Sequence, residues 1–141
     1  MKNKIPLLLA VAVLAGCAAE TGDRYNVDIR WTSYGITHVT ADDWGSLGYG
    51  FAYATATDGI CVFAREVSRA NGTMAADFGA SDENIASDTF HRALVTTDRV
   101  QKNAAAMSEN MQRYSAGFVD GYNRFIEDNR DNLPESCAGE E

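Results

Sequence analysis

The sequence lacks the short signatures of the commonest enzyme chemistries. It has no Gly-x-Ser-x-Gly elbow, because WGSLG at residues 44–48 does not have that spacing. It has no phosphate-binding loop, since GYG at residues 48–50 is not followed by Gly-Lys-Ser or Gly-Lys-Thr. There is no Cys-x-x-Cys pair, and the two histidines, His38 and His91, lie far apart and share no motif. We therefore expect both histidines to be structural or surface residues, and the residues alone predict no nucleotide, serine-elbow or zinc site.

Long apolar runs are also missing. A membrane-spanning helix takes about 20 apolar residues, and the run at residues 5–15 is roughly half that length. Lys2 and Lys4 precede it, which is the arrangement of an export signal. The sequence therefore predicts that residues 1–16 are a cleaved signal peptide.

The end of this run is LAGC at residues 14–17, which resembles the lipobox of bacterial lipoproteins. The resemblance implies cleavage before Cys17, a lipid on its sulfur and a tether over residues 17–25. The alternative is an ordinary export signal that happens to precede a cysteine. Because Ala18 rather than aspartate follows the cysteine, the resemblance implies a periplasm-facing lipoprotein of the outer membrane in a Gram-negative cell.

Basic residues are scarce. The chain has 12 Lys and Arg against 20 Asp and Glu, a net charge of -8. Removing residues 1–16 takes away two lysines and no acids, which leaves 10 basic residues against 20 acidic ones and a net charge of -10. This balance argues against nucleic acid and anionic membrane surfaces as partners, because both repel an acidic protein. Contact with a membrane would come from the lipid on Cys17.

Proline is absent between residues 42 and 72, so one long helix is permitted there. Just before it, residues 27–41 alternate around a turn and predict a β-hairpin, in which Gly35 allows a positive φ. The stretch SLGYGFAYATATDG, residues 46–59, fits both the period of a strand and that of a helix. A cap at Asp42 or Asp43, a stop at Gly72, a helical period after the stretch and the total length favour the helix. Four glycines oppose this helix, each by about 1 kcal/mol: Gly45, Gly48, Gly50 and Gly59.

The second half of the chain is also predicted to be helical. Residues 79–97 have the composition of a loop with a short helix at 88–94. Apolar residues then recur at steps of three and four, which predicts one long helix over residues 98–129 with Asp98 as its cap. The residues thus predict a small, mostly helical unit with an N-terminal hairpin.

Three segments in consistent order resemble the penicillin acylase family of N-terminal-nucleophile amidohydrolases. Residues 34–79 carry a Tyr-Gly-x-x-His turn, a Gly-Tyr-Gly-aromatic stretch, an aspartate step and an arginine-bearing helix. SDTFHRAL at residues 87–94 resembles a family segment with Asp and Arg, and residues 114–129 resemble a helix with Gly-x-Asn. The matching positions are Tyr34, Gly35, His38, Gly48, Tyr49, Gly50, Asp58, Arg65, Asp88, Arg92, Gly121 and Asn123. Gly59 departs from the pattern, since the family commonly has Arg or Asn there, and this weakens that helix turn.

The resemblance implies an α+β fragment of an αββα fold, in which residues 26–141 form part of an acylase α subunit. The family's nucleophile is a Ser, Cys or Thr at the N-terminus of the β subunit, and its own α-amino group is the base. No residue of this chain matches it, so we expect no catalytic residue here and no activity of the chain alone. The implied partners are the rest of the α subunit and the β subunit.

The complete enzyme would hydrolyse the acyl amide of an N-acyl homoserine lactone, a lipopeptide or a β-lactam. No cofactor or metal is implied for these residues, although calcium is compatible with the complete enzyme. A second hypothesis is a stand-alone lipoprotein binding module that kept an acylase-like fold and lost the chemistry. It predicts a cooperatively folded monomer, whereas the fragment predicts exposed apolar helix faces.

Two cysteines remain once Cys17 is set aside. In an oxidising compartment, Cys61 and Cys137 are candidates for a disulfide, and the alternative is two buried thiols. The disulfide hypothesis requires the helix over residues 98–129 to run back, antiparallel, along the first long helix. The same two cysteines make the chain resemble the branch that deacylates homoserine lactones and aculeacin-type lipopeptides.

Overall fold

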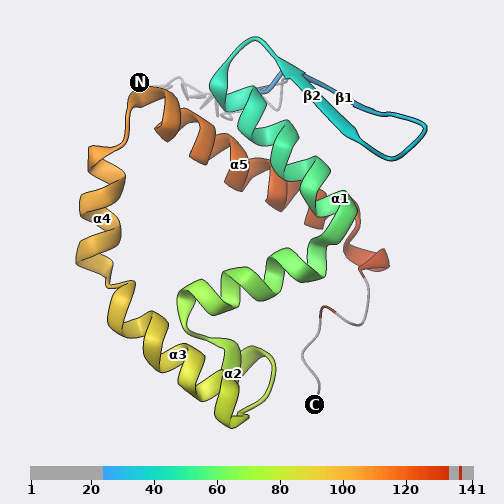
Figure 1. Cartoon of the computed structure of the whole chain (residues 1–141). Helices are drawn as coiled ribbons and strands as arrows, with labels where there is room; N and C mark the ends of the chain where they lie inside the picture. The colour runs from blue at the N-terminus through green and yellow to red at the C-terminus, as the bar shows by residue number, and fades with distance from the viewer. Residues whose placement is uncertain (1–23, 134–136, 138–141) are drawn as a thin grey trace, which may run out of the picture.

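The computed structural model describes residues 24–133 and residue 137; the expected signal peptide and Cys17 lie outside the described residues. Two strands are followed by helices that succeed one another around an open ring (Figure 1). Within the described part, no helix is both long and apolar enough to span a membrane. The elements are β1 (Val27–Trp31), β2 (Thr37–Ala41), α1 (Trp44–Asn71), α2 (Met74–Asp77), α3 (Asp82–Leu94), α4 (Thr97–Ala106), α5 (Glu109–Asp128) and the 3-10 helix η1 (Arg130–Asn132).

The predicted hairpin is present. Strands β1 and β2 are antiparallel, with Val27 opposite Ala41 and Trp31 opposite Thr37. The turn closes because the N–H of Gly35 donates to the carbonyl of Thr32 at 2.9 Å and Gly35 itself has φ 77°. A glycine tolerates this left-handed conformation because it has no Cβ.

The stretch with two periods is helical, as the sequence context favoured. Helix α1 begins after Asp43, whose carboxylate accepts a hydrogen bond from the N–H of Ser46 at 3.0 Å, and hydrogen bonds from Ser46 lower the pKa of that carboxyl. It ends at Gly72, which has φ 66°. Inside it, Gly59 leaves the helical region with φ -169° and ψ 57°, and α1 bends there. The bend falls at the turn that the sequence predicted to be weak.

The helices after α1 differ from the prediction in two places. Helix α3 starts at Asp82 rather than at residue 88, because Ser81 caps it by accepting from the N–H of Asn84. The single helix predicted over residues 98–129 is wrong: the chain leaves the helical conformation at Met107, and Ser108 caps a new helix, α5. Apolar residues recur at helical spacing on both sides of the break, so the pattern does not reveal it. The only local signal of the new helix is its capping residue, Ser108.

Helices α1 and α5 pack in parallel through glycines, and the antiparallel arrangement expected from the sequence is wrong. Gly45 lies against Gly117, Tyr49 against Gly121, and the ring of Tyr53 meets that of Phe125 at 5.5 Å, so both helices advance in the same direction. The physical reason is the break before Ser108. Helices α3 and α4 carry the chain back to the start of α1, and α5 begins beside it (Figure 1).

The hairpin packs on another face of α1. A Cβ built at Gly50 would lie 2.9 Å from the Cγ1 of Val39 and would overlap Val27. The buried apolar residues of the described chain are few and mostly small: Ala52, Ala54, Ala56, Ile60, Met74 and Phe125. Close backbone approach, rather than a large side-chain core, therefore holds α1 to its neighbours.

Two connections tie down the ends of this assembly. The cysteines of the candidate pair are joined: a disulfide links Cys61 and Cys137, whose Cα atoms are 4.5 Å apart. At the other end, Tyr25 stacks on Tyr49 with 4.7 Å between ring centroids and donates its hydroxyl to Asp120 at 2.5 Å. Burial, and then this hydrogen bond, raise the pKa of Tyr25 to about 12. Tyr25, at the end of the expected tether, is thus part of the packed structure.

Candidate functional site

The twelve positions that carry the family resemblance fall into three groups in the structure. The first group packs α1 against its neighbours: Gly48, Tyr49, Gly50 and Gly121. The second joins the end of α1 to α2 and α3: Arg65, Asp88 and Arg92. The third lies at or near the surface: Tyr34, Gly35, His38, Asp58 and Asn123.

The second group is a buried clamp. Asp88, only 8% exposed, accepts hydrogen bonds from the backbone N–H of Met74 at 2.8 Å and of Ala75 at 2.9 Å. One turn later on α3, the Nε of Arg92 donates to the carbonyl of Gly72 at 2.7 Å. The carboxylate satisfies the free N–H groups at the start of α2, and the guanidinium satisfies the carbonyl that ends α1. These two residues have a structural role.

Arg65 belongs to the same region. Its guanidinium carbon lies 4.8 Å from the centre of the Phe78 ring, a cation–π contact across the turn between α1 and α3. Asn84 supports that turn from α3 by donating to the carbonyls of Phe78 and Gly79.

The hairpin places His38 on its outer face. There it lines an open depression of about 470 Å³ together with Asp28, Arg30, Trp31, Thr32 and Thr40. Asp58 lies on the other side of the hairpin, where it accepts a weak hydrogen bond from Thr37 at 3.4 Å. The structure therefore does not bring His38 and Asp58 into one catalytic arrangement. Within the described residues, no group of three or more His, Cys, Asp or Glu could hold a metal ion.

One serine–histidine contact was not predicted from the sequence. The Oγ of Ser87 lies 3.4 Å from the Nδ1 of His91, one turn further along α3. The same Nδ1 lies 2.8 Å from the backbone carbonyl of Ser87, an acceptor that requires the proton to be on Nδ1. A protonated Nδ1 cannot take the proton of the serine hydroxyl, so this pair is a local helix contact and not an activated nucleophile.

The hairpin also has two unpaired edges. The N–H of Thr32 donates to the carbonyl of Ile36, and hydrogen-bonded pairs alternate along an antiparallel ladder. The outward N–H and C=O groups are therefore those of Val27, Ile29 and Trp31 on β1 and those of Thr37, Val39 and Ala41 on β2. No other strand of the described chain pairs with either edge. Such edges are ready to pair with a further strand.

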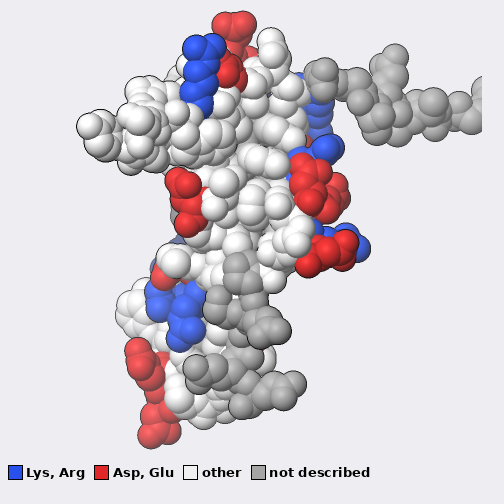
Figure 2. Space-filling view, turned by 90° about the vertical axis from the view of Figure 1, so that its right-hand side faces the viewer, with Lys and Arg blue, Asp and Glu red and all other residues white. Residues whose placement is uncertain are grey.

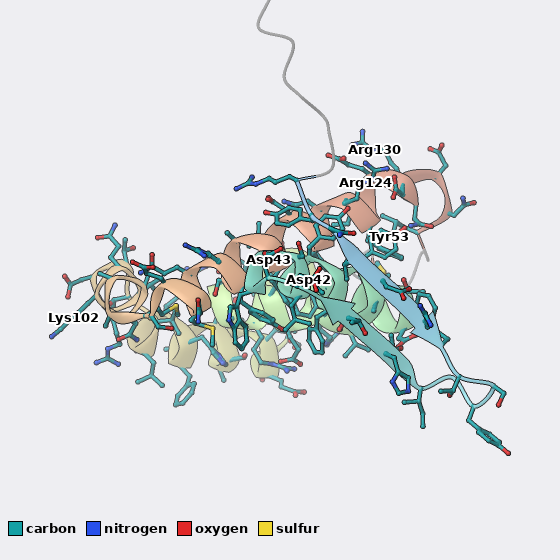
Figure 3. The ribbon with its side chains drawn as sticks, turned by 90° about the horizontal axis from the view of Figure 1, so that it is seen from above. Asp42, Asp43, Tyr53, Lys102, Arg124 and Arg130 are labelled. Carbon is teal, nitrogen blue, oxygen red and sulfur yellow. A yellow bond between two sulfur atoms is a disulfide. The ribbon has the colours of Figure 1, made fainter. Side chains whose placement is uncertain are left out.

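Large apolar side chains are exposed on most elements. Tyr34 at the hairpin tip is 91% exposed, and helix α4 has no buried residue. The hairpin projects beyond the helices, at the opposite end from Lys102 on α4 (Figure 3). Charged side chains form small groups of mixed sign between wide uncharged areas (Figure 2). Other exposed apolar residues are Trp31, Ile36, Trp44, Phe51, Val62, Val67, Ile85, Phe90, Leu94, Val95, Val100, Met107, Met111 and Val119.

Comparison with known proteins shows what kind of chain has this arrangement. Penicillin amidase is the family that matches, over residues 26–139. The chain belongs to this family. It is 38% identical over 129 residues to acyl-homoserine lactone acylase PvdQ of Pseudomonas fluorescens, a match that covers 84% of this chain and 16% of the relative. It is also 38% identical over 113 residues to aculeacin-A acylase of Actinoplanes utahensis, over 72% of this chain and 14% of the relative.

A solved structure of the same family agrees with the fold. Thermostable penicillin G acylase from Alcaligenes faecalis aligns with a TM-score of 0.67 and 33% identity, over 78% of this chain and 59% of that one. The predicted class, mostly helical with an N-terminal hairpin, is confirmed, and so is the likeness to the homoserine lactone and aculeacin acylases. The chain spans only 16% and 14% of the lengths of the two curated relatives.

Proposed function

We propose that this chain is the N-terminal part of the α subunit of an amide-cleaving acylase, and that its own role is to scaffold a nucleophile located elsewhere in the enzyme. One observation carries the proposal. This chain covers only 16% of the length of its relative PvdQ, and its described residues leave two sheet edges and many large apolar side chains uncovered. The uncovered hairpin would join the sheet of the nucleophile domain, and the open helix faces would pack on the rest of the enzyme.

The complete enzyme would hydrolyse the acyl side-chain amide of N-acyl homoserine lactones, lipopeptides or β-lactams. The names of the relatives, acyl-homoserine lactone acylase and aculeacin-A acylase, support the first two classes. The geometry of Ser87 and His91 supports a nucleophile outside this chain. The Nδ1 of His91 already carries a proton, so it cannot act as the base that would activate Ser87.

The test is to assay the chain alone and together with the part encoded after Glu141. We expect release of free homoserine lactone from its N-acyl form only when both parts are present, because the nucleophile comes from the second part. Activity of the chain alone would contradict the proposal. So would a stop codon after Glu141 in a genome that encodes no partner.

The second candidate function, a non-catalytic binding module, makes a different prediction for the isolated chain. If the chain is a scaffold, the fifteen large apolar side chains exposed on its described residues, among them Phe90 and Val62, should bind a hydrophobic dye and make the isolated chain associate. A binding module should instead be a monomer that unfolds cooperatively and binds little dye. Sedimentation and thermal unfolding of residues 18–141 distinguish the two functions.

We further propose that the protein is an exported lipoprotein anchored through Cys17, facing the periplasm from the outer membrane. Replacing Cys17 by serine should leave the precursor without lipid and move the protein from the detergent phase to the aqueous phase, because a lipid chain supplies the attraction to the membrane. Phase partitioning and fractionation measure this. Cys61→Ser is the matched control and should stay in the detergent phase. Unchanged partitioning of Cys17→Ser would contradict the anchor.

A further inference from the structure

The two halves of α1 belong to different packing units. The half before Gly59 packs on α5 and on the hairpin through its glycines. The half after Gly59 carries α2 and α3, to which the end of α1 is fastened by the hydrogen bonds of Asp88 and Arg92. Gly59 is non-helical, and a Cβ built there meets nothing closer than 4.0 Å, so no neighbour crowds the bend at this position. The bend is therefore a candidate hinge between two units (Figure 1).

The contacts between α5 and the residues just after this bend, Ile60 and Phe63, are apolar. The ring of Phe63, just after it, lies 5.4 Å from the ring of Phe118 and 4.8 Å from that of Tyr122, both on α5. Apolar contacts of this kind can slide, since the hydrophobic effect is non-directional. At the far side of the ring of helices, α4 links α3 to α5 without burying a residue.

The covalent link across the bend is the disulfide. Cys61 follows Gly59 by two positions, and Cys137 follows α5, which is fixed to the half of α1 before the bend. The bond thus joins the two units directly. It also holds Leu133 and Cys137 against the small cluster of Ala56, Ile60 and Phe125.

We propose that the Cys61–Cys137 disulfide is a redox-controlled clasp that fixes the bend of α1 and holds Leu133 and Cys137 beside it. In the oxidised protein the two units form one body. Reduction frees Cys137 and Leu133 from the cluster, uncovers Ile60 and lets the half of α1 after Gly59 move relative to α5. In a reducing compartment before export the bend is free, and in an oxidising compartment it is locked.

The chemistry needs a dithiol reductant of the kind that exchanges with protein disulfides. One thiolate of the reductant attacks a sulfur of the Cys61–Cys137 bond, which releases one protein thiol and forms a mixed disulfide. The second thiol of the reductant then attacks the mixed disulfide and releases the other protein thiol. The Cys61–Cys137 bond becomes two thiols, and the reductant becomes a disulfide, so two electrons and two protons pass to the protein. Both cysteines are partly exposed, which lets the reductant reach them.

Hydrogen exchange measured by mass spectrometry on the exported full chain, with and without a dithiol reductant, tests the clasp. We expect backbone amides in residues 60–67 and 130–133 to exchange about tenfold faster or more after reduction, because local opening no longer breaks a covalent constraint. Amides in residues 46–56 and 114–125 should change by less than about twofold, since the glycine contacts between α1 and α5 remain. Equal exchange in the two states, or the same acceleration along the whole chain, would overturn the proposal.

Two variants control the measurement. The double variant Cys61→Ser, Cys137→Ser should exchange like the reduced protein and ignore the reductant. Cys17→Ser keeps the clasp and should respond to the reductant as the parent chain does. If the double variant does not fold, titration of the parent chain with reductant still gives the decisive pattern. A response to reductant in a folded double variant would also refute the clasp.

Discussion

Replacing Gly121 by alanine should destabilise the fold by roughly 2–3 kcal/mol, although alanine is the better helix former by about 1 kcal/mol. The added Cβ would overlap the carbonyl oxygen of Tyr49 and lie 2.8 Å from its carbonyl carbon. Backbone atoms of α1 cannot turn aside as a flexible side chain can, so α5 must shift away. That shift would also separate Gly117 from Gly45. Chemical denaturation of the exported chain, followed by far-UV circular dichroism, measures the loss.

The matched control for this substitution is Asn123→Ala, two residues further along the same Gly-x-Asn motif. Asn123 is exposed, so alanine should raise the stability by a few tenths of a kcal/mol through helix propensity alone. Opposite signs for the two variants would show that contact with α1, and not the composition of α5, requires glycine. If Gly121→Ala also stabilised the chain, the parallel contact of α1 with α5 would be wrong.

Replacing Asp88 by alanine should cost about 3 kcal/mol, the second large effect. The substitution removes a buried carboxylate that accepts from two backbone N–H groups, those of Met74 and Ala75, and hydrogen bonds to a charged group each contribute about 1.5–3 kcal/mol. Without the carboxylate, the first N–H groups of α2 have no acceptor from α3. We expect α2 and the end of α1 to loosen while the hairpin stays packed.

The control is Asp131→Ala, which removes an exposed carboxylate from η1 and should change the stability by less than about 0.5 kcal/mol. Denaturation midpoints measure both variants, and residue-resolved exchange locates the loosening. A cost for Asp88→Ala no larger than that for Asp131→Ala would show that the clamp contributes little. Loosening of the hairpin rather than of α2 would show that Asp88 stabilises a different part of the chain.

Several elements could be predicted from the sequence because their causes are local. The turn at Gly35, an aspartate cap and the stop at Gly72 each depend on a residue and its near neighbours in the chain, and each is present, with Asp43 as the cap. The same kind of signal was available at Ser108 but was masked, since apolar residues keep the helical period through the break at Met107. Serine before a run with helical period was the cue.

The candidate site was only partly predictable for a different reason. The family positions could be named from the sequence, but their roles depend on what they touch. Asp88 and Arg92 prove to be a clamp on helix ends, whereas His38 faces solvent on the hairpin. Gly117, which no motif singled out, is as tightly packed as Gly121. Its spacing of four from Gly121 was the signal for a close helix contact.

By itself the sequence determined part of the local structure, the hairpin and the capped glycine-rich helix, and it determined the family through the acylase pattern at residues 34–129. Only the tertiary structure decided that α1 and α5 run parallel and which motif residues are buried. Caps and turns act within a few residues, so they can be read along the chain. The direction of helix packing depends on where the chain returns after a break, and that is settled by contacts between residues far apart in sequence.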